Sequence, residues 1–403
     1  MTTNKDDAYC ATRFIILLFI LLTTISYGYA LYYNRYNGDF LRTKVALSQS
    51  QLFFNYIISL LPYIGLWIIY KHFKKKPANI KKIEIPVHFF KQFLYFVFFA
   101  STTVTLLYGV GKMGAPAYQA PTLIKSFIIV LNRFPLLYLG MVFILLSNNK
   151  SHILIIATMM VILGILRAGL GVFLCLALVF ILKYYANIFR FVKRRWLLII
   201  IISIFSPFLV QKMYSLRSSL RDDYRIEKED LITGKLCGRL STFGNYCFIM
   251  QNSDYFKRHI HELDGSYYQK MAASAVVGES MMPGTRPEKM IIEAGGSSSK
   301  NVGFMCGVPG ILLISSYKSP WLLWVNLLTI IMLVICAFKI ARRFDTPFAN
   351  EIAFLFMIYP VLSGVGSEYA LFGFILLSFF VFILVVKLLS AKKQINSPKT
   401  KQQ

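Results

Sequence analysis

Acidic side chains are scarce in this sequence. Its 403 residues include 18 Asp and Glu against 44 Lys and Arg, and all charged residues together make up only 15% of the chain. A chain with 56% hydrophobic residues and so little charge lies outside the composition of ordinary soluble globular proteins. The composition therefore predicts an all-α, polytopic integral membrane protein.

The sequence also lacks the motifs that mark several classes of enzyme and transporter. It contains no P-loop, no Rossmann glycine fingerprint, no GxSxG elbow and no HExxH pair. Nothing indicates coupling to ATP or a serine nucleophile, and we expect neither a cofactor nor a metal. The internal repeat that marks many secondary transporters is absent from the sequence as well.

The excess of basic residues has a topological explanation. Lysines and arginines concentrate in short segments that flank apolar runs, so the net charge of +26 does not indicate nucleic acid as a partner. Lys5 and Arg13 precede the first apolar run, which is long and has no small-residue cleavage site after it. We therefore expect a signal anchor that stays in the protein.

Eight apolar stretches approach or reach the roughly 20 residues that span a bilayer. They cover residues 14–32, 52–70, 93–110, 125–147, 197–213, 320–338, 348–366 and 369–388. The basic clusters at 71–91 and 190–195 are cytoplasmic by the positive-inside rule. Because residues 148–152 return to the same side, parity requires a further hairpin over 153–182. The prediction is ten spans with both termini cytoplasmic.

Arg167 lies in the middle of that hairpin, in the run ILIIATMMVILGILRAGLGVFLCLALVFIL. Each arm has about 12 to 14 apolar residues, or roughly 18 to 21 Å of helix, which is short of a hydrocarbon core of about 30 Å. We therefore expect Arg167 to be recessed at the floor of a vestibule that opens to the outside. A charge at this depth favours a functional role, although a purely structural one stays open.

The polar segment after residue 213 is far longer than a typical connection and is therefore expected to be functional. Parity excludes residues 302–317 as a full span, so we expect a re-entrant or interfacial element there, which periodicity alone does not separate from a short buried helix. The expected parts are an N-terminal transmembrane bundle (1–213), a large outer loop (214–319), C-terminal transmembrane helices (320–390) and a cytoplasmic tail (391–403).

A row of arginines opens the outer loop. Arg217, Arg221 and Arg225 recur every four residues, which places them on one face of a helix. Guanidinium forks bind phosphate oxygens bidentately, so this row suits a diphosphate. The alternative is an exposed helix with local acid-base pairs. The acidic residues available for such pairs are Asp222, Asp223, Glu227 and Glu229.

The next segment, CGRLSTFGNYCFIMQN, places Arg239 ahead of an apolar and aromatic patch. Cys237 and Cys247 lie ten residues apart on the side assigned to the exterior, where an oxidising compartment permits a disulfide. Cys306 is a third thiol on that side, so the pairing is open. Two thiols that never meet are the alternative.

The segment YFKRHIHELDGSYYQKM contains His259 and His261. A histidine can act as a general base near neutral pH, and His261 is the candidate for that role. A metal site lacks a third ligand at convincing spacing, and a surface polar role is the remaining alternative. The segment MPGTRPEK follows, with turns imposed by its prolines and with Arg286 as a further candidate for binding an anionic substrate.

The whole layout resembles the O-antigen or oligosaccharide repeat-unit polymerases of the Wzy type. The resemblance includes ten or more spans, the LRAGLG turn inside an apolar hairpin, and a large outer loop late in the chain. Within that loop, GRLSTF, LDGSYYQKM and MPGTRPEK resemble the family's arginine-led helix, its Gly-x-Ser/Thr-Tyr/Phe step and its proline-rich turn. The Arg-x10-Gly spacing described for some members is absent.

The resemblance implies a metal-independent glycosyltransferase of the GT-C-like, polyprenyl-dependent class. Such an enzyme transfers a growing glycan from undecaprenyl diphosphate to a new lipid-linked repeat unit at the periplasmic face of the bacterial inner membrane. The family's arginines that bind glycan and diphosphate match Arg167 and then Arg239, with Arg217, Arg221 and Arg225 beside it. A chain-length regulator and a flippase are the implied partners.

Two other functions fit the same layout. An O-antigen ligase shares the architecture, transfers the glycan to a lipid A core, and would suit a histidine such as His261 in the large loop. A lipid-linked oligosaccharide flippase or other transporter is expected to carry charges through many spans and needs no large late loop. Few mid-span charges besides Arg167 are visible, which favours the enzymes over the transporter.

Overall fold

All regular secondary structure is helical in the part of the chain that the computed structural model describes. That part comprises residues 5–41, 43–75, 82–112, 119–132, 134–167, 169, 171–197, 205, 208, 211–212, 215, 231–277, 281, 284–295, 306–364, 375, 378, 381 and 384. Within these ranges no strand forms, and only isolated bridges join extended residues. The helical fold class predicted from the composition is therefore confirmed.

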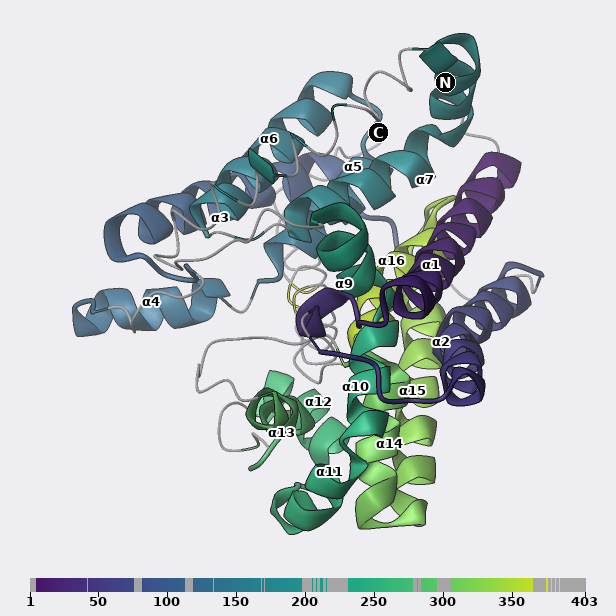
Figure 1. Ribbon diagram of the computed structural model, residues 1–403. Coiled ribbons are helices and arrows are strands. Elements are labelled where there is room, and N and C mark those ends of the chain that lie inside the picture. Colours follow the sequence, from purple (N-terminus) through teal and green to yellow (C-terminus); the bar gives the residue numbers. More distant parts are fainter. Residues whose placement is uncertain are drawn as a thin grey trace, which may run out of the picture.

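The helices lie in the apolar stretches and in the polar segment after residue 213, called the late segment below, which contains the three late motifs GRLSTF, LDGSYYQKM and MPGTRPEK (Figure 1). In chain order they are α1 (Lys5–Tyr33), η1 (Gly38–Phe40), α2 (Gln49–Lys75), α3 (Val87–Tyr108), α4 (Thr122–Asn132), α5 (Leu136–Leu146), α6 (Lys150–Leu166), α7 (Gly171–Arg194), η2 (Leu231–Cys237), α9 (Gly238–Ser241), α10 (Phe243–Gln251), α11 (Ser253–His259), η3 (Ile260–Glu262), α12 (Tyr267–Val277), α13 (Pro287–Ala294), α14 (Gly307–Lys318), α15 (Pro320–Ala341) and α16 (Ala349–Ser363). Proline begins α13 and α15, where a missing N–H costs no hydrogen bond.

Five helices in the described part are long and apolar enough to cross a membrane, namely α1, α2, α3, α7 and α15. The pair α4–α5, bent by 47°, makes a sixth if it acts as one span. Helix α6 and the start of α16 are apolar but shorter. The chain thus has the apolar helices of a multi-pass membrane protein, while the count of ten spans stays a prediction.

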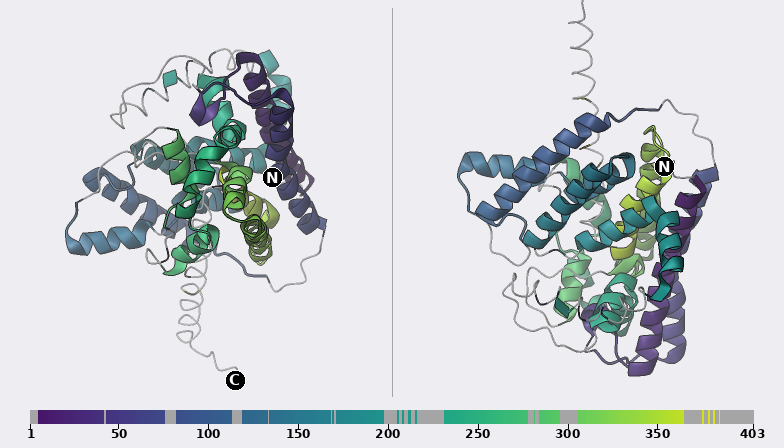
Figure 2. Two further views of the ribbon diagram at one scale, coloured as in Figure 1. Left: turned by 60° about the horizontal axis from the view of Figure 1, so that its bottom comes forward. Right: turned by 90° about the horizontal axis from the view of Figure 1, so that it is seen from above.

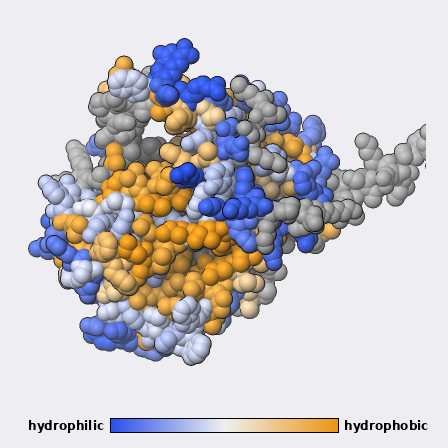
Figure 3. All heavy atoms as spheres, turned by 90° about the vertical axis from the view of Figure 1, so that its right-hand side faces the viewer, coloured by the Kyte–Doolittle hydropathy of each residue, from blue (hydrophilic) through white to orange (hydrophobic). Residues whose placement is uncertain are grey.

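Large apolar side chains cover the outside of several of these helices. Leu21 on α1 is 54% exposed, Phe54 on α2 is 61% exposed and Trp321 on α15 is 78% exposed. Figure 3 shows an apolar surface across the middle of the side that faces right in Figure 1, with hydrophilic residues below it. Soluble monomers rarely expose contiguous apolar surface on this scale, whereas lipid-facing helices require it.

Helix α16 lies at the centre of the packing and contacts α1, α2, α7, α14 and α15. On one side of it α1 and α2 run next to each other, and on another α3, α5, α6 and α7 pack together (Figures 1 and 2). The short helices α10 to α13 lie on the same side of the molecule as α14. Because α16 contacts the α1–α2 pair, α7 of the second group, and α14, it links these parts of the fold.

Two segments singled out in the sequence differ in length from the expectation. Helix α7 continues to Arg194, beyond the expected end of the hairpin at 182, and bends at Tyr184. Residues 307–318 form α14, a helix of about 18 Å that packs against α10, α15 and α16 with one face buried. The re-entrant or interfacial element expected over 302–317 stays a prediction, because a helix of this length fits either alternative.

Candidate functional site

Glycines let the connection after α1 pack closely against α9 and α10, a junction called the clamp below. Gly38 has φ +85°, a left-handed conformation that other residues rarely adopt. A Cβ on Gly238 would lie only 2.1 Å from Gly38 N, and a Cβ on Gly244 would lie 2.4 Å from Asn37 O. Only glycine permits backbones to approach this closely. The connection and the start of the late segment therefore form one packed unit.

A buried ion pair joins the same two parts of the chain. Arg239 Nε donates to Asp39 Oδ1 at 2.6 Å, across 200 residues of sequence, and Asn245 Nδ2 donates to Asp39 Oδ2 at 3.0 Å. The Asp39 side chain is 3% exposed. A buried carboxylate is costly unless it is paired and hydrogen-bonded. Asp39 therefore depends on Arg239, and in return it fixes the place of the guanidinium.

A buried polar network supports this ion pair from the C-terminal end of α1. Asn37 Nδ2 and Ser241 Oγ both donate to Ser26 Oγ, at 2.8 and 2.7 Å. Tyr36 OH donates to Gln251 Oε1 at 2.5 Å, which ties the connection to the end of α10. Satisfied polar networks of this kind specify one arrangement of the groups they join. They hold the segment that carries Asp39 in a single position.

The motifs LDGSYYQKM and MPGTRPEK lie against each other. Asp264 N donates to Thr285 O at 3.0 Å, and Asp264 Oδ2 accepts from Gly284 N at 3.1 Å and from Lys270 Nζ at 2.7 Å. Burial raises the pKa of Asp264, but these hydrogen bonds outweigh burial and lower the pKa below its ordinary value. The two segments thus fold as one unit around an ionised carboxylate.

Tyr267, Glu288 and Cys306 extend this unit toward Asp39. The buried Tyr267 hydroxyl donates a hydrogen bond to Glu288 Oε1. Cys306 is fully buried, and burial together with the nearby charges of Glu288 and Asp39 raises the pKa of its thiol well above the ordinary value. Both carboxylates therefore lie near the Cys306 thiol. We call Asp39, Arg239, Tyr267, Glu288 and Cys306 the carboxylate cluster.

A second glycine junction brings the end of α16 to the carboxylate cluster. Gly307 has φ +68° and Gly364 has φ +65°. A Cβ on Gly364 would lie 2.4 Å from Gly307 C, and a Cβ on Gly307 would lie 2.7 Å from Thr242 Oγ1. Tyr268 OH donates to Gly364 O at 3.0 Å. GRLSTF and LDGSYYQKM therefore meet at the start of α14 and the end of α16, and MPGTRPEK joins them through its contacts with LDGSYYQKM.

Arg167 is the residue that ends α6. Its Nε donates to Thr105 Oγ1 at 3.3 Å, and its guanidinium lies against the backbone of Gly111, where a Cβ would be 3.0 Å from Nε. Among the residues that the structure describes, no carboxylate forms an ion pair with Arg167. A half-buried guanidinium with a hydroxyl as its neighbour retains its affinity for an anion.

Helix α16 relates the hairpin tip to the carboxylate cluster. A Cβ on Gly171, at the start of α7, would lie 3.4 Å from Tyr359 OH on α16. Tyr359 and Gly364 are five residues apart in sequence, or about 7.5 Å along a helix. The turn that carries Arg167 thus lies beside the same helix that ends at the late motifs.

The structure places the other predicted site residues differently from Arg239 and Arg167. Arg286 is exposed and immediately precedes α13. The His261 side chain is 75% exposed, with Nε2 3.9 Å from Glu262 Oε1. Arg217, Arg221 and Arg225 lie outside the described residues. The roles assigned to these side chains stay predictions.

The two cysteines considered for a disulfide are both thiols in the structure. Cys237 precedes α9 and Cys247 lies in the middle of α10, and both are buried. Asn55 Nδ2 donates to Cys247 Sγ at 3.6 Å, and burial raises the pKa of this thiol. Of the two alternatives left open for Cys237 and Cys247, the structure has the one with two thiols.

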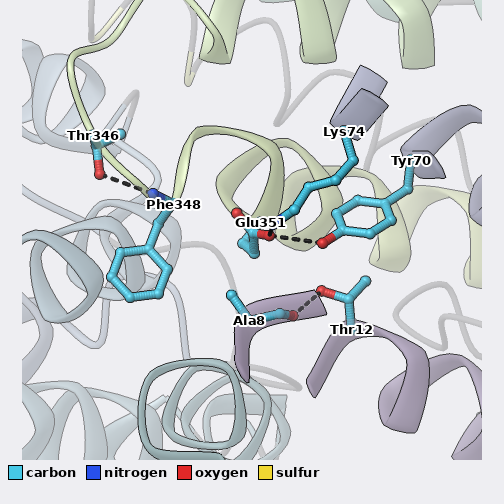
Figure 4. Close-up of polar contacts among 7 residues, drawn as sticks. All are labelled: Ala8, Thr12, Tyr70, Lys74, Thr346, Phe348 and Glu351. Carbon is cyan, nitrogen blue, oxygen red and sulfur yellow. Dashed lines mark hydrogen bonds and ion pairs between the residues drawn. The ribbon is translucent and has the colours of Figure 1, made fainter. Parts of the chain in front are cut away.

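Glu351 forms a buried polar site at the other end of α16 (Figure 4). Its carboxylate is 0% exposed, and Oε1 accepts from Tyr70 OH at 2.7 Å and from Lys74 Nζ at 3.2 Å. Thr12 on α1 lies nearby (Figure 4). This site joins α2 to α16 about 20 Å along α16 from Gly364. The sequence shows a glutamate near a helix end but not its burial.

Lys183 is a second buried charge that the sequence analysis missed. Its side chain lies on α7, and Nζ donates to the carbonyl oxygens of Ile144, Leu145 and Ser147. These carbonyls end α5, where the helix dipole favours a cation and the last carbonyls lack helical partners. Lys183 thus fastens α7 to the end of α5. A lysine at the end of an apolar run is the only signal of this role in the sequence.

Metal ligands are not grouped in the described ranges, where no three His, Cys, Asp or Glu side chains are placed to share an ion. The cluster instead offers two carboxylates, a guanidinium, a phenol and a neutral thiol. Such groups can bind polar ligands and accept a proton. Comparison with protein-family models, with curated proteins and with solved structures found no match.

Proposed function

We propose that this protein is a membrane glycosyltransferase that polymerises undecaprenyl-diphosphate-linked repeat units into an O-antigen or similar surface polysaccharide. The observation that supports it is the meeting of GRLSTF, LDGSYYQKM and MPGTRPEK around the carboxylate cluster, beside the helix that passes the Arg167 turn. Segments chosen from the sequence for their resemblance to such polymerases thus prove to be neighbours in the fold.

The chemistry of this reaction matches the groups present. A diphosphate is a good leaving group, so the enzyme has to stabilise charge on phosphate, orient two lipid-held sugars and take up one proton. Arg167 supplies a guanidinium without a described carboxylate partner, and Arg286 supplies an exposed one. Either can bind phosphate oxygens without a metal.

The contacts between connections support the orientation in this proposal, with both termini in the cytoplasm. Lys82 pairs with Asp345 at 3.0 Å, and Lys91 Nζ lies 3.4 Å from His152 Nε2. Both contacts join segments that the positive-inside rule places in the cytoplasm. The contacts of Asp39 with Arg239 and of Arg167 with Gly111 join segments that parity places outside.

A ladder gel of lipopolysaccharide tests the proposal. Cells that lack the gene are complemented with the wild-type protein at a matched membrane level. We expect deletion to leave single repeat units attached to the core and complementation to restore the ladder. Loss of every attached repeat would indicate the ligase or the flippase instead, and an unchanged ladder would refute a role in this pathway.

A further inference from the structure

Glu288 brings a carboxylate to the place where the late motifs meet. It is the second residue of α13 and is half-buried, and its Oε1 accepts a hydrogen bond from Tyr267 on α12. Tyr267 is itself 1% exposed, so packing fixes the donor. A carboxylate that a packed donor orients at Oε1 and whose Oε2 is buried is desolvated and held in place, which is the arrangement of a general base.

We propose that Glu288 accepts the proton of the acceptor sugar hydroxyl and that Tyr267 positions its carboxylate. The inference rests on the proposed function. In this step the acceptor oxygen bonds to the anomeric carbon of the donor glycan. The bond from that carbon to the diphosphate oxygen breaks, and the lipid diphosphate leaves with the electron pair. The hydroxyl proton passes to Glu288 and from there to water.

Glu288 suits this role better than Asp39 of the carboxylate cluster or His261 of the late segment. Asp39 is 3% exposed and accepts from Arg239 and Asn245, so its oxygens hold the fold together. The His261 side chain is 75% exposed, and a site open to water does not orient a proton acceptor. Glu288 lies between these extremes of burial.

The surroundings of Glu288 combine charges of both signs. The exposed guanidinium two residues before it can hold a phosphate or a sugar hydroxyl beside the carboxylate. The thiol before α14 is neutral because its pKa is raised, so it adds no charge. Among the described residues, Tyr267 donates to Glu288, and Cys306 lies near both Glu288 and Asp39, which pairs with Arg239. Arg286 and Lys289 flank Glu288 in the sequence.

The test uses the full-length protein in lipid nanodiscs and lipid-linked repeat units extracted from cells that lack the gene. Initial rates of polymer formation are measured from acid to neutral pH, together with binding of the same repeat units. We expect Glu288→Gln to lower the rate by about 10²- to 10⁴-fold with binding unchanged. Glu293→Gln is the matched control, because Glu293 is exposed on the same helix and pairs only with Lys289 at 3.6 Å in the described part. Its rate should equal that of the wild type.

Tyr267→Phe separates positioning from a merely structural contact. Removing the donor destabilises the ionised carboxylate of Glu288, so its pKa rises and the acid limb of the rate profile moves to higher pH. A structural contact would lower the yield of folded protein without moving that limb. This variant decides the matter if Glu288→Gln fails to fold.

The possible outcomes distinguish the inference from the proposed function. If the wild type polymerises and Glu288→Gln keeps more than about a tenth of its rate, the inference is wrong and the proposed function stands. An unmoved acid limb in Tyr267→Phe would contradict the inference in the same way. If the wild type forms no polymer from these repeat units, the proposed function fails and the role of Glu288 fails with it.

Discussion

Arg239 and Arg167 occupy opposite environments, although the sequence presents both as candidates for binding an anion. The Asp39 carboxylate accepts a hydrogen bond from Arg239 Nε at 2.6 Å and offsets the charge of the guanidinium inside the carboxylate cluster. Arg167 has a threonine hydroxyl as neighbour and no ion pair among the described carboxylates. The availability of a guanidinium is therefore decided by the carboxylates that folding brings to it.

Arg239 and Arg167 also differ in the backbone that surrounds them. Gly38, Gly238, Gly307 and Gly364 let four stretches of chain touch near the carboxylate cluster. At the hairpin tip the Arg167 guanidinium lies against Gly111 and a side-chain hydroxyl. We infer that the cluster region holds the shape of the site, and that Arg167 contributes a charge to it from the neighbouring hairpin.

The largest effect on stability is expected from Arg239→Ala. Removing one partner of a buried ion pair costs about 3 to 5 kcal/mol, because the remaining charge stays buried and unpaired. Thermal and denaturant unfolding of the purified protein measures this loss. The double variant Asp39→Asn with Arg239→Gln should recover part of it. Wild-type stability of Arg239→Ala would show that Asp39 does not depend on the pair.

Arg167→Ala is expected to act on function and not on folding. Polymer formation should fall at least about 100-fold, equivalent to about 2.7 kcal/mol, at an unchanged membrane level. The Thr105 hydroxyl keeps its own acceptor, Val110 O at 3.0 Å, so little stability is lost. Arg167→Lys should recover little activity, because a point charge lacks the guanidinium fork. Loss of folded protein in Arg167→Ala would remove the contrast with Arg239.

Gly238→Ala tests whether backbone contact shapes the cluster. Its Cβ would lie 2.1 Å from Gly38 N, so the clamp has to open, at a cost of about 1 to 3 kcal/mol or more. Gly65→Ala in α2 is the control, since nothing lies within 4 Å of its Cβ. Alanine there should raise stability by up to about 1 kcal/mol through helix propensity. Effects of equal sign in both variants would contradict the clamp.

The smallest effect, and one that depends on pH, is expected from Asp264→Asn. The pKa of Asp264 is lowered in the folded protein, so its charge contributes stability above the unfolded pKa of about 3.9 and loses it as pH falls through the folded pKa. We expect a loss of about 1 kcal/mol at neutral pH that shrinks below about pH 4. Unfolding measured at both pH values checks the sign.

Several features of the fold follow from local sequence. Scarce charge and apolar runs predicted helices, and α1, α2, α3, α7 and α15 are the helices that these runs predict. Arg167 was recognisable because a charge inside an apolar run stands out in sequence. The three late motifs were recognisable as segments, but their mutual contacts were not, since hydrogen bonds such as Asp264 N to Thr285 O depend on how separate turns dock.

What the sequence determined by itself was therefore the helical class and the choice of motifs, because hydrophobicity and turn residues act over short stretches of chain. Only the tertiary structure decided that Asp39 is buried with Arg239 across 200 residues, that Cys237 and Cys247 stay thiols, and that Glu288 meets Tyr267. These outcomes depend on desolvation and pairing between distant segments, and a residue's environment after packing cannot be read from its neighbours in the chain.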